Sequence, residues 1–107
     1  MKIYLAAPYS HPHSQVRELR FKLINVKAAE LMCQGHIVFS PISHSHPIAV
    51  QEDLPLSFEF WQAMNESFIK WCDAVYVYRL DGWQQSKGIH AEIEYANKIN
   101  KTIHYID

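Results

Sequence analysis

Four short runs rich in β-branched and aromatic residues alternate with helical segments, and this alternation limits the possible folds more than any other feature. The runs are Lys2–Ala7, His36–Phe39, Ala74–Tyr78 and Thr102–Ile106. Strands that alternate with helices are joined by right-handed crossovers, which produce a parallel sheet with helices on both faces. The sequence therefore predicts an α/β protein, a three-layer α/β/α sandwich with a mostly parallel sheet of four to five strands.

Apolar residues at helical spacing predict three helices, which begin near Ser14, Ser57 and Ser86. Gly35 is expected to end the first of them. Residues 40–55 contain three prolines and are predicted to form a long loop, which in a small domain is usually functional. The residues expected to form the apolar faces are Val16, Leu19, Leu23, Val26 and Ala29, then Trp61, Met64, Phe68 and Trp71, then Ile89, Ile93, Ala96 and Ile99.

The size and charge of the chain exclude several classes of protein. With 107 residues it forms a single domain over residues 1–107, and its net charge of −1 argues against a dedicated DNA- or RNA-binding protein. No apolar run is as long as a membrane span, and the first residues read as a strand rather than a signal peptide. Cys33 and Cys72 form no CxxC pair and are predicted to be buried thiols in a reducing compartment. We therefore expect a cytoplasmic protein without membrane or nucleic-acid partners.

The predicted binding edge lies beyond the carboxyl ends of the strands, near the point where the strand order reverses. The segment after the first strand is neither a P-loop nor a dinucleotide-binding loop, because GxxxxGK[ST] and GxGxxG are absent. Its small residues allow a ligand to approach the backbone, and Tyr9 and Ser10 add hydroxyl groups. Arg17 and Arg20 on the following helix could reach a phosphate or could line a solvated helix face.

The start of the last predicted helix is a candidate site for an anion and for a nucleophile. Ser86 and Gly88 open this helix, and the amides at a helix N-terminus attract anions. Glu92 lies in its early turns, where the helix dipole favours an ionised carboxylate that can act as a nucleophile. Glu94 is an ordinary helix-surface alternative.

Two pairs of histidines, His11 with His13 and His44 with His46, lie in segments at the predicted binding edge. Three interpretations stay open: metal ligands, contacts to a base or sugar, and incidental surface histidines. No HExxH motif or CxxC pair accompanies them, so the spacing alone does not define a zinc site.

Four segments carry a family resemblance that spans nearly the whole chain: KIYLAAPYS, GHIVFSPISHSHPI, CDAVYVY and GWQQSKGIHAEIEYA. The chain resembles the nucleoside 2-deoxyribosyltransferase-like superfamily, especially its small bacterial and phage branch, the DUF1937 proteins. The most specific element is S-x-G-x-x-x-E at Ser86, Gly88 and Glu92. The resemblance implies a flavodoxin-like fold and cleavage of the N-glycosidic bond of nucleosides or nucleoside 5′-monophosphates.

The resemblance also implies roles for individual residues. Glu92 matches the nucleophile that attacks the anomeric carbon and forms a covalent glycosyl-enzyme, and Ser86 matches a residue that binds the 5′-phosphate. Five residues match the part of the chain around the sugar and phosphate: Tyr4, Ala7, Pro8, Tyr9 and Ser10. Further candidate substrate-binding residues are Ser43, His44, His46, Asp81, Trp83 and Gly88.

Two departures from the family pattern concern phosphate binding and the proton donor. The first loop lacks the Gly- and Arg-rich sequence of the nucleotide-hydrolysing relatives. Asn65 stands where the resemblance implies a proton-handling Asp, and an amide has no titratable proton. Another carboxylate, Glu66, Asp73 or Asp81, would then have to serve, although Asp73 and Asp81 also suit local turn and capping roles.

The sequence thus leads to one main hypothesis and two alternatives. The main hypothesis is an enzyme without cofactor or metal that cleaves the N-glycosidic bond of a deoxynucleoside or nucleoside 5′-monophosphate by transfer or hydrolysis. Its catalytic candidates are Glu92, Asn65 and Asp73. The alternatives are a non-catalytic nucleotide-binding module, favoured by Asn65, and a metal hydrolase built on the loop histidines. The many large aromatic residues, and relatives that complete their sites across a subunit interface, predict a homodimer or homotetramer.

Overall fold

The computed structural model describes all residues, 1–107, and contains four strands, four α-helices and one short 3-10 helix. None of the helices has the length and apolar character needed to cross a membrane. The elements in chain order are β1 (Lys2–Ala6), α1 (Ser14–Cys33), β2 (Ile37–Phe39), α2 (Pro41–Glu52), α3 (Phe58–Trp71), β3 (Ala74–Tyr78), η1 (Trp83–Gln85), α4 (Lys87–Lys98) and β4 (Thr102–Ile106).

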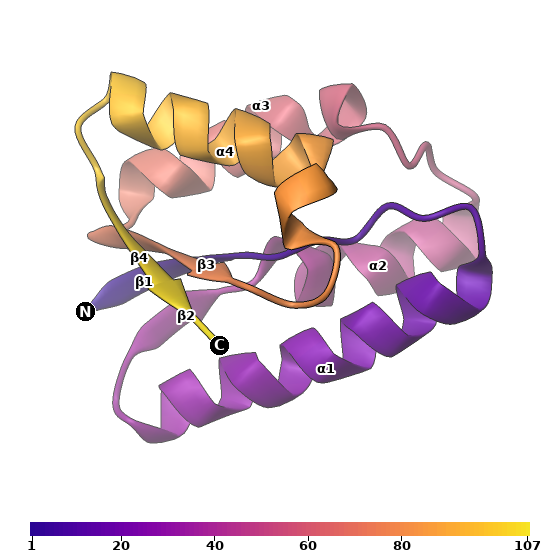
Figure 1. Cartoon of the computed structure of the whole chain (residues 1–107), viewed down its shortest axis with the longest axis horizontal. Helices are drawn as coiled ribbons and strands as arrows, with labels where there is room; N and C mark the ends of the chain where they lie inside the picture. Colours follow the sequence, from indigo (N-terminus) through magenta and orange to yellow (C-terminus); the bar gives the residue numbers. More distant parts are fainter.

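The four strands form one parallel sheet in the order β2-β1-β3-β4. Figure 1 shows α1 on one face of this sheet and α3 and α4 on the other, which is a flavodoxin-like α/β/α arrangement. The predicted fold class is therefore confirmed, with four strands. Because β1 has β2 on one side and β3 on the other, the strand order reverses next to β1, and a crevice opens there between the chain segments that follow β1 and β3.

Strand β1 forms the centre of the core because it is buried from both sides. Its side chains alternate, so Ile3 and Leu5 pack toward α1 while Tyr4 and Ala6 pack toward α3 and α4. All four are completely buried. Tyr4 is the only one with a polar group, so its hydroxyl needs a partner inside the protein.

The face of α1 that meets the sheet differs from the predicted one. Leu19, Leu23 and Val26 were expected to be buried, but they are 56%, 38% and 58% exposed. Apolar residues occur around most of this helix, so their spacing fits more than one face, and the small Ala28 lets the helix approach the sheet closely. The buried residues of α1 are Ile24, Ala28 and Leu31.

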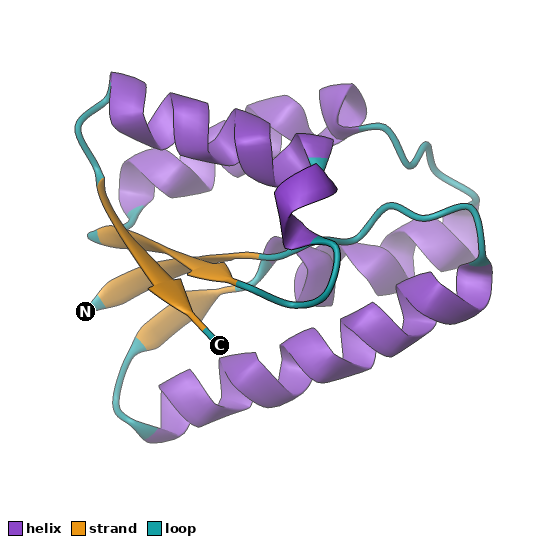
Figure 2. Ribbon diagram, in the orientation of Figure 1, coloured by secondary structure: helices purple, strands orange, loops and turns teal.

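The prediction of a long loop at residues 40–55 is wrong, because most of this segment forms helix α2 (Figure 2). Pro41 is the first helical residue. Its fixed φ suits a helix there, and an N–H at this position would have no partner within the helix. Pro47 lies inside the helix, where proline costs about 3 kcal/mol. Burial of side chains such as His46 and Ala49, where α2 packs on α1 and β1, offsets that cost.

The prediction of two buried thiols is confirmed for Cys72 and wrong for Cys33. Cys72 is buried, and its thiol donates a hydrogen bond to the carbonyl oxygen of Ile69 at 3.1 Å. Cys33 is exposed because it is the last residue of α1, where the helix gives way to a solvent-facing turn.

Candidate functional site

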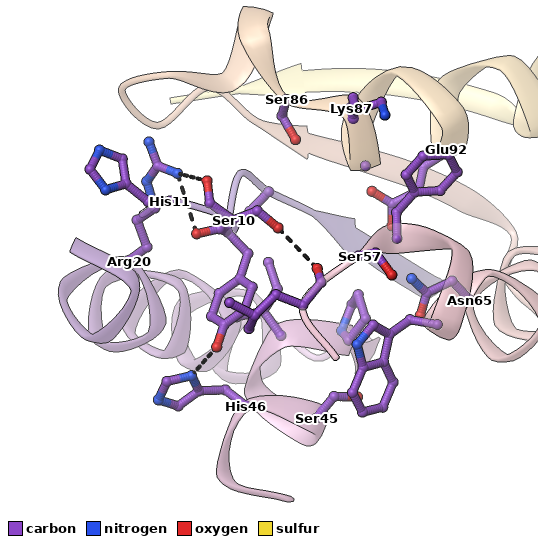
Figure 3. Close-up of a pocket in the computed structure, with 18 of the residues that line it drawn as sticks. Ser10, His11, Arg20, Ser45, His46, Ser57, Asn65, Ser86, Lys87 and Glu92 are labelled. Carbon is purple, nitrogen blue, oxygen red and sulfur yellow. Dashed lines mark hydrogen bonds between the residues drawn. The ribbon is translucent and has the colours of Figure 1, made fainter. Parts of the chain in front are cut away.

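A cavity of about 570 Å³ lies at the carboxyl ends of β1 and β3. Its walls come from the segment after β1, from α1, α2 and α3, and from the segment that leads through η1 into α4 (Figure 3). The reversal of strand order next to β1 explains this position, since neighbouring connections leave the sheet in opposite directions there. A cavity of this volume is in the range of sites for small ligands and cofactors.

Glu92 on α4 contributes a carboxylate to this cavity, and Tyr4 holds it from behind. The Tyr4 hydroxyl donates a hydrogen bond to Oε2 of Glu92. Burial raises the pKa of Glu92 to about 7, although the hydrogen bond from Tyr4 acts in the opposite direction. Burial and the adjacent carboxylate both raise the pKa of Tyr4, so the phenol stays protonated and remains a donor. Glu94, the alternative two residues further on, is exposed.

Asn65 on α3 lies in the same part of the cavity as Glu92 (Figure 3). Its Oδ1 atom is buried and has no hydrogen-bond partner in the protein. A buried oxygen without a partner costs free energy, so it is an acceptor available to a ligand that brings a hydroxyl or amine group.

The N-terminus of α4 adds free backbone donors to the cavity wall. The Ser86 hydroxyl caps this helix by accepting a hydrogen bond from the amide of Ile89 at 3.2 Å. The first amides of a helix have no intrahelical partner, so those of Lys87 and Gly88 remain available where these residues line the cavity. The prediction that Ser86 begins this helix is confirmed.

Arg20 on α1 brings a positive charge to the cavity and connects two of its walls. Its guanidinium donates to the carbonyl oxygens of Tyr9 and Ser10, at 3.3 and 3.1 Å, and to that of Asp81 at 3.3 Å. None of these partners is charged, so no carboxylate neutralises Arg20. Gly82 has a φ of +90° and sits so close to Arg20 that an added Cβ would lie 2.5 Å from Nη2.

Most of the predicted site residues come together at this cavity. Tyr4 stands directly behind Glu92, as the hydrogen bond between them requires. His46 reaches the cavity from α2 and not from a loop, and its side chain is buried. The predicted residues that line the cavity are Ala7, Tyr9, Ser10, His46, Asn65, Ser86, Gly88 and Glu92.

The remaining predicted residues do not line the cavity. Asp73 precedes β3 at the opposite edge of the sheet, where its carboxylate accepts a hydrogen bond from the amide of Lys2 at 2.8 Å. That bond holds the pKa of Asp73 below its ordinary value, so Asp73 is a structural carboxylate and not the proton donor of this site. The others that lie outside the cavity lining are Pro8, Ser43, His44, Asp81 and Trp83.

Each of these residues has a structural reason for its place. Pro8 is completely buried, and Ser43 pairs its hydroxyl with that of Ser40 at 2.8 Å. His44 is exposed on α2. Trp83 packs against the core on the α4 side of the sheet, and Asp81 offers its backbone oxygen to Arg20.

The two histidine pairs do not assemble a metal site. His11 and His13 lie with ring centroids 5.3 Å apart, but no group of three His, Cys, Asp or Glu side chains is arranged to hold a metal ion. His46 hydrogen-bonds to Tyr9 and Glu18, so both of its ring nitrogens are already engaged. The donor set gives no support to a metal hydrolase.

Several residues in or next to the cavity were not predicted from the sequence. Trp61 was assigned to the core by helical spacing, yet it lines the cavity. Glu18 lies outside the cavity lining but contacts His46, and it gave no sequence signal because that contact depends on α2, which the prolines concealed. The further cavity-lining residues that were not among the predicted site residues are Pro41, Ile42, Ser45, Ala49, Leu56, Ser57, Phe58, Glu59, Gly82, Gln85 and Lys87.

The family comparison covers the whole chain. The chain belongs to the DUF1937 family, whose model, described as a domain of unknown function, matches residues 1–107. No curated protein matches the sequence. Membership confirms the resemblance to DUF1937 proteins and by itself assigns no activity, so the function has to be argued from the cavity.

Proposed function

We propose that this DUF1937 protein cleaves the N-glycosidic bond of a nucleoside 5′-monophosphate, by hydrolysis or by transfer of the glycosyl group, with Glu92 as the nucleophile. The observation that carries the proposal is the pair formed by Glu92 and Tyr4 at the wall of the cavity. Tyr4 engages one carboxylate oxygen and leaves the other for attack on an anomeric carbon. The resemblance to nucleoside 2-deoxyribosyltransferases supports the same chemistry.

The proposed reaction has two displacement steps. In the first, Oε1 of Glu92 attacks C1′, and the bond from C1′ to the base nitrogen breaks with its electron pair on the base, which takes up a proton. In the second, water or another base attacks C1′, and the bond from C1′ to Glu92 breaks with its electron pair returning to the carboxylate. Two displacements retain the configuration at C1′. A pKa of about 7 leaves a large share of Glu92 ionised at neutral pH.

The opposite side of the cavity suits a phosphate group. Figure 3 shows Arg20 and His11 on the side of the cavity away from Glu92 and Asn65. The un-neutralised guanidinium of Arg20 attracts an anion there, the free amides at the start of α4 add donors to the cavity wall, and Ser10 and Ser86 also line the cavity. These features favour a 5′-monophosphate over an unphosphorylated nucleoside.

Aromatic residues supply a surface for the base. The Trp61 indole is fixed by its donation to the carbonyl oxygen of Pro55 at 2.9 Å, and it lines the cavity together with Phe58 and Leu56. A flat heteroaromatic base stacks favourably on such a side chain.

The test is base release from a panel of nucleosides and their ribo- and deoxyribonucleoside 5′-monophosphates, followed by mass spectrometry. We expect release from at least one 5′-monophosphate and loss of that activity in Glu92→Gln. Glu94→Gln is the matched control, because Glu94 lies on the same helix but is exposed. Absence of release from every member of the panel would contradict the proposal.

A nucleotide-binding module without chemistry is the second candidate, and the amide at position 65 is the observation that favours it. Such a module would be stabilised against heat by a 5′-monophosphate in the wild type and in Glu92→Gln alike. It would release no base in either case. The same panel therefore separates the two candidates.

A further inference from the structure

A chain of three polar side chains, centred on a buried histidine, leads from the cavity to the protein surface. The Tyr9 hydroxyl, in the cavity wall, lies 2.5 Å from Nδ1 of His46. The other ring nitrogen of His46, Nε2, lies 2.7 Å from Oε2 of Glu18. Tyr9 follows β1, His46 lies on α2 and Glu18 lies on α1, so three separate segments build this chain.

The packing around His46 holds the chain in place. The side chain of His46 is only 6% exposed, and the Phe21 ring stacks on its imidazole with ring centroids 4.3 Å apart. A buried imidazole with both nitrogens engaged keeps its orientation. The dashed line at His46 in Figure 3 marks the hydrogen bond that Tyr9 forms with it.

The two ends of the chain face different environments. The side chain of Glu18 is 48% exposed to solvent, whereas Tyr9 lines the cavity. Burial raises the pKa of Tyr9, which keeps its phenol protonated, although the charge of Arg17 acts in the opposite direction. The chain therefore connects a solvent-exposed carboxylate to the phenol of a residue that lines the cavity.

We propose that Tyr9 is the catalytic proton donor to the departing base, and that His46 and Glu18 are positioning residues that resupply its proton. This inference rests on the proposed function and supplies the donor that Asn65 cannot be. It also accounts for a buried histidine in α2 whose ring nitrogens bridge two other segments.

The proton transfers balance over the two steps. The proposed cycle begins with an N–H on each ring nitrogen of His46, one toward the Glu18 carboxylate and one toward the Tyr9 oxygen. As the base leaves, it takes the phenol proton, and the phenolate takes the Nδ1 proton of His46. In the second step the attacking water gives a proton to Tyr9, the Tyr9 proton passes to Nδ1, and the starting state returns.

The test compares substrates that need a proton on the leaving base with substrates that do not. The base of 7-methyl-2′-deoxyguanosine 5′-monophosphate carries a positive charge and leaves as a neutral molecule. The base of 2′-deoxyguanosine 5′-monophosphate needs protonation. If the wild type cleaves only pyrimidine nucleotides, 5-nitro-2′-deoxyuridine and 2′-deoxyuridine 5′-monophosphates form the corresponding pair, and ribonucleotide pairs serve if the wild type requires ribose.

We expect Tyr9→Phe to lower the rate by about 10²-fold on the substrate that needs a proton and by less than about threefold on the other. Glu18→Gln should also lower the rate more on the substrate that needs a proton than on the other. Because Glu18 is half-exposed, this variant keeps the fold. Tyr105→Phe and Glu30→Gln are matched controls at exposed positions outside the cavity.

The outcomes separate this inference from the proposed function. Equal losses on both substrates, or no loss on either, would overturn the role of Tyr9 while leaving the glycosidic cleavage itself intact. Wild-type protein that releases no base from any member of the pairs would overturn the proposed function and the proton donor together.

Discussion

Tyr4 and Glu92 lie 88 positions apart in the sequence, and one hydrogen bond joins them across the core. Tyr4 is the fully buried residue of β1 that points toward α4, and Glu92 is the residue of α4 that meets it at the cavity. The bond satisfies the only polar group among the inward-facing side chains of β1. It also fixes a carboxylate whose burial raises its pKa to about 7.

The pH dependence of base release should report on Glu92. Because the ionised carboxylate is the nucleophile, kcat/KM should fall as the pH drops through about 7. Tyr4→Phe removes the hydrogen bond that lowers the pKa of Glu92, so the midpoint of this fall should move to higher pH. Rates measured from pH 5 to pH 9 test both statements. A midpoint near pH 4.5, or a downward shift in Tyr4→Phe, would contradict them.

The stability of the protein should also depend on pH through the raised pKa of Glu92. The folded-state pKa of Glu92, about 7, lies above the ordinary value of 4.5, so the folded state favours the protonated carboxyl. The resulting contribution to stability is complete below pH 4.5 and is lost as the pH rises through about 7.

Glu92→Gln should therefore gain stability relative to the wild type as the pH rises. Its free energy of unfolding should improve by about 2 kcal/mol more at pH 8 than at pH 4.5, a value reduced for the partial exposure of the side chain. Urea unfolding at the two pH values measures this difference. Glu94→Gln should show none, and an equal effect of Glu92→Gln at both values would refute the buried-carboxylate account.

The contact between Gly82 and Arg20 should determine phosphate binding. In Gly82→Ala the new Cβ would lie 2.5 Å from Nη2 of Arg20, so the guanidinium must leave its present position. We expect affinity for a nucleoside 5′-monophosphate to fall at least about tenfold, close to the strength of one charged hydrogen bond. Isothermal titration calorimetry measures this.

Gly35→Ala is the matched control for this substitution. Gly35 also has a positive φ, +93°, but nothing lies within 4 Å of its added Cβ. Both variants should lose about 1 kcal/mol of stability from backbone strain. Only Gly82→Ala should lose affinity, and an equal loss in the two would show that Arg20 has no part in binding.

The unpartnered oxygen of Asn65 should matter for ligands and not for folding. Because Oδ1 has no partner in the free protein, Asn65→Ala breaks no hydrogen bond through that atom and should change the free energy of unfolding by less than about 1 kcal/mol. Binding of a nucleoside 5′-monophosphate should weaken about tenfold. A large loss of stability with unchanged affinity would indicate a purely structural amide.

The sequence was sufficient for the fold because its strands are strongly marked. Ala74–Tyr78 and Thr102–Ile106 were predicted with the bounds that the structure shows. The predicted cap at Ser86 was also correct, and with it the start of α4 and the placement of Glu92. Local signals of this kind, strand composition and helix capping, are readable without tertiary information.

The errors arose where tertiary packing outweighs local preference. Prolines at positions 41 and 47 concealed α2, and with it the bridging position of His46. The exposed face of α1 was mistaken for the buried one because apolar residues surround that helix. Trp61 lines the cavity and Glu18 contacts His46 behind it, and both positions depend on neighbours in space that spacing along the chain cannot reveal. The homodimer or homotetramer expected from the sequence stays a prediction.

Direct detection of a covalent glycosyl group on Glu92 tests the central claim. The protein is incubated with a 2-fluoro-sugar nucleoside 5′-monophosphate, which slows the second displacement, and is then digested and mapped by tandem mass spectrometry. The account predicts a glycosyl adduct on the peptide that contains Glu92, absent from Glu92→Gln and present in Glu94→Gln. Base release by the wild type without any adduct on Glu92, or with an adduct on another residue, would contradict it.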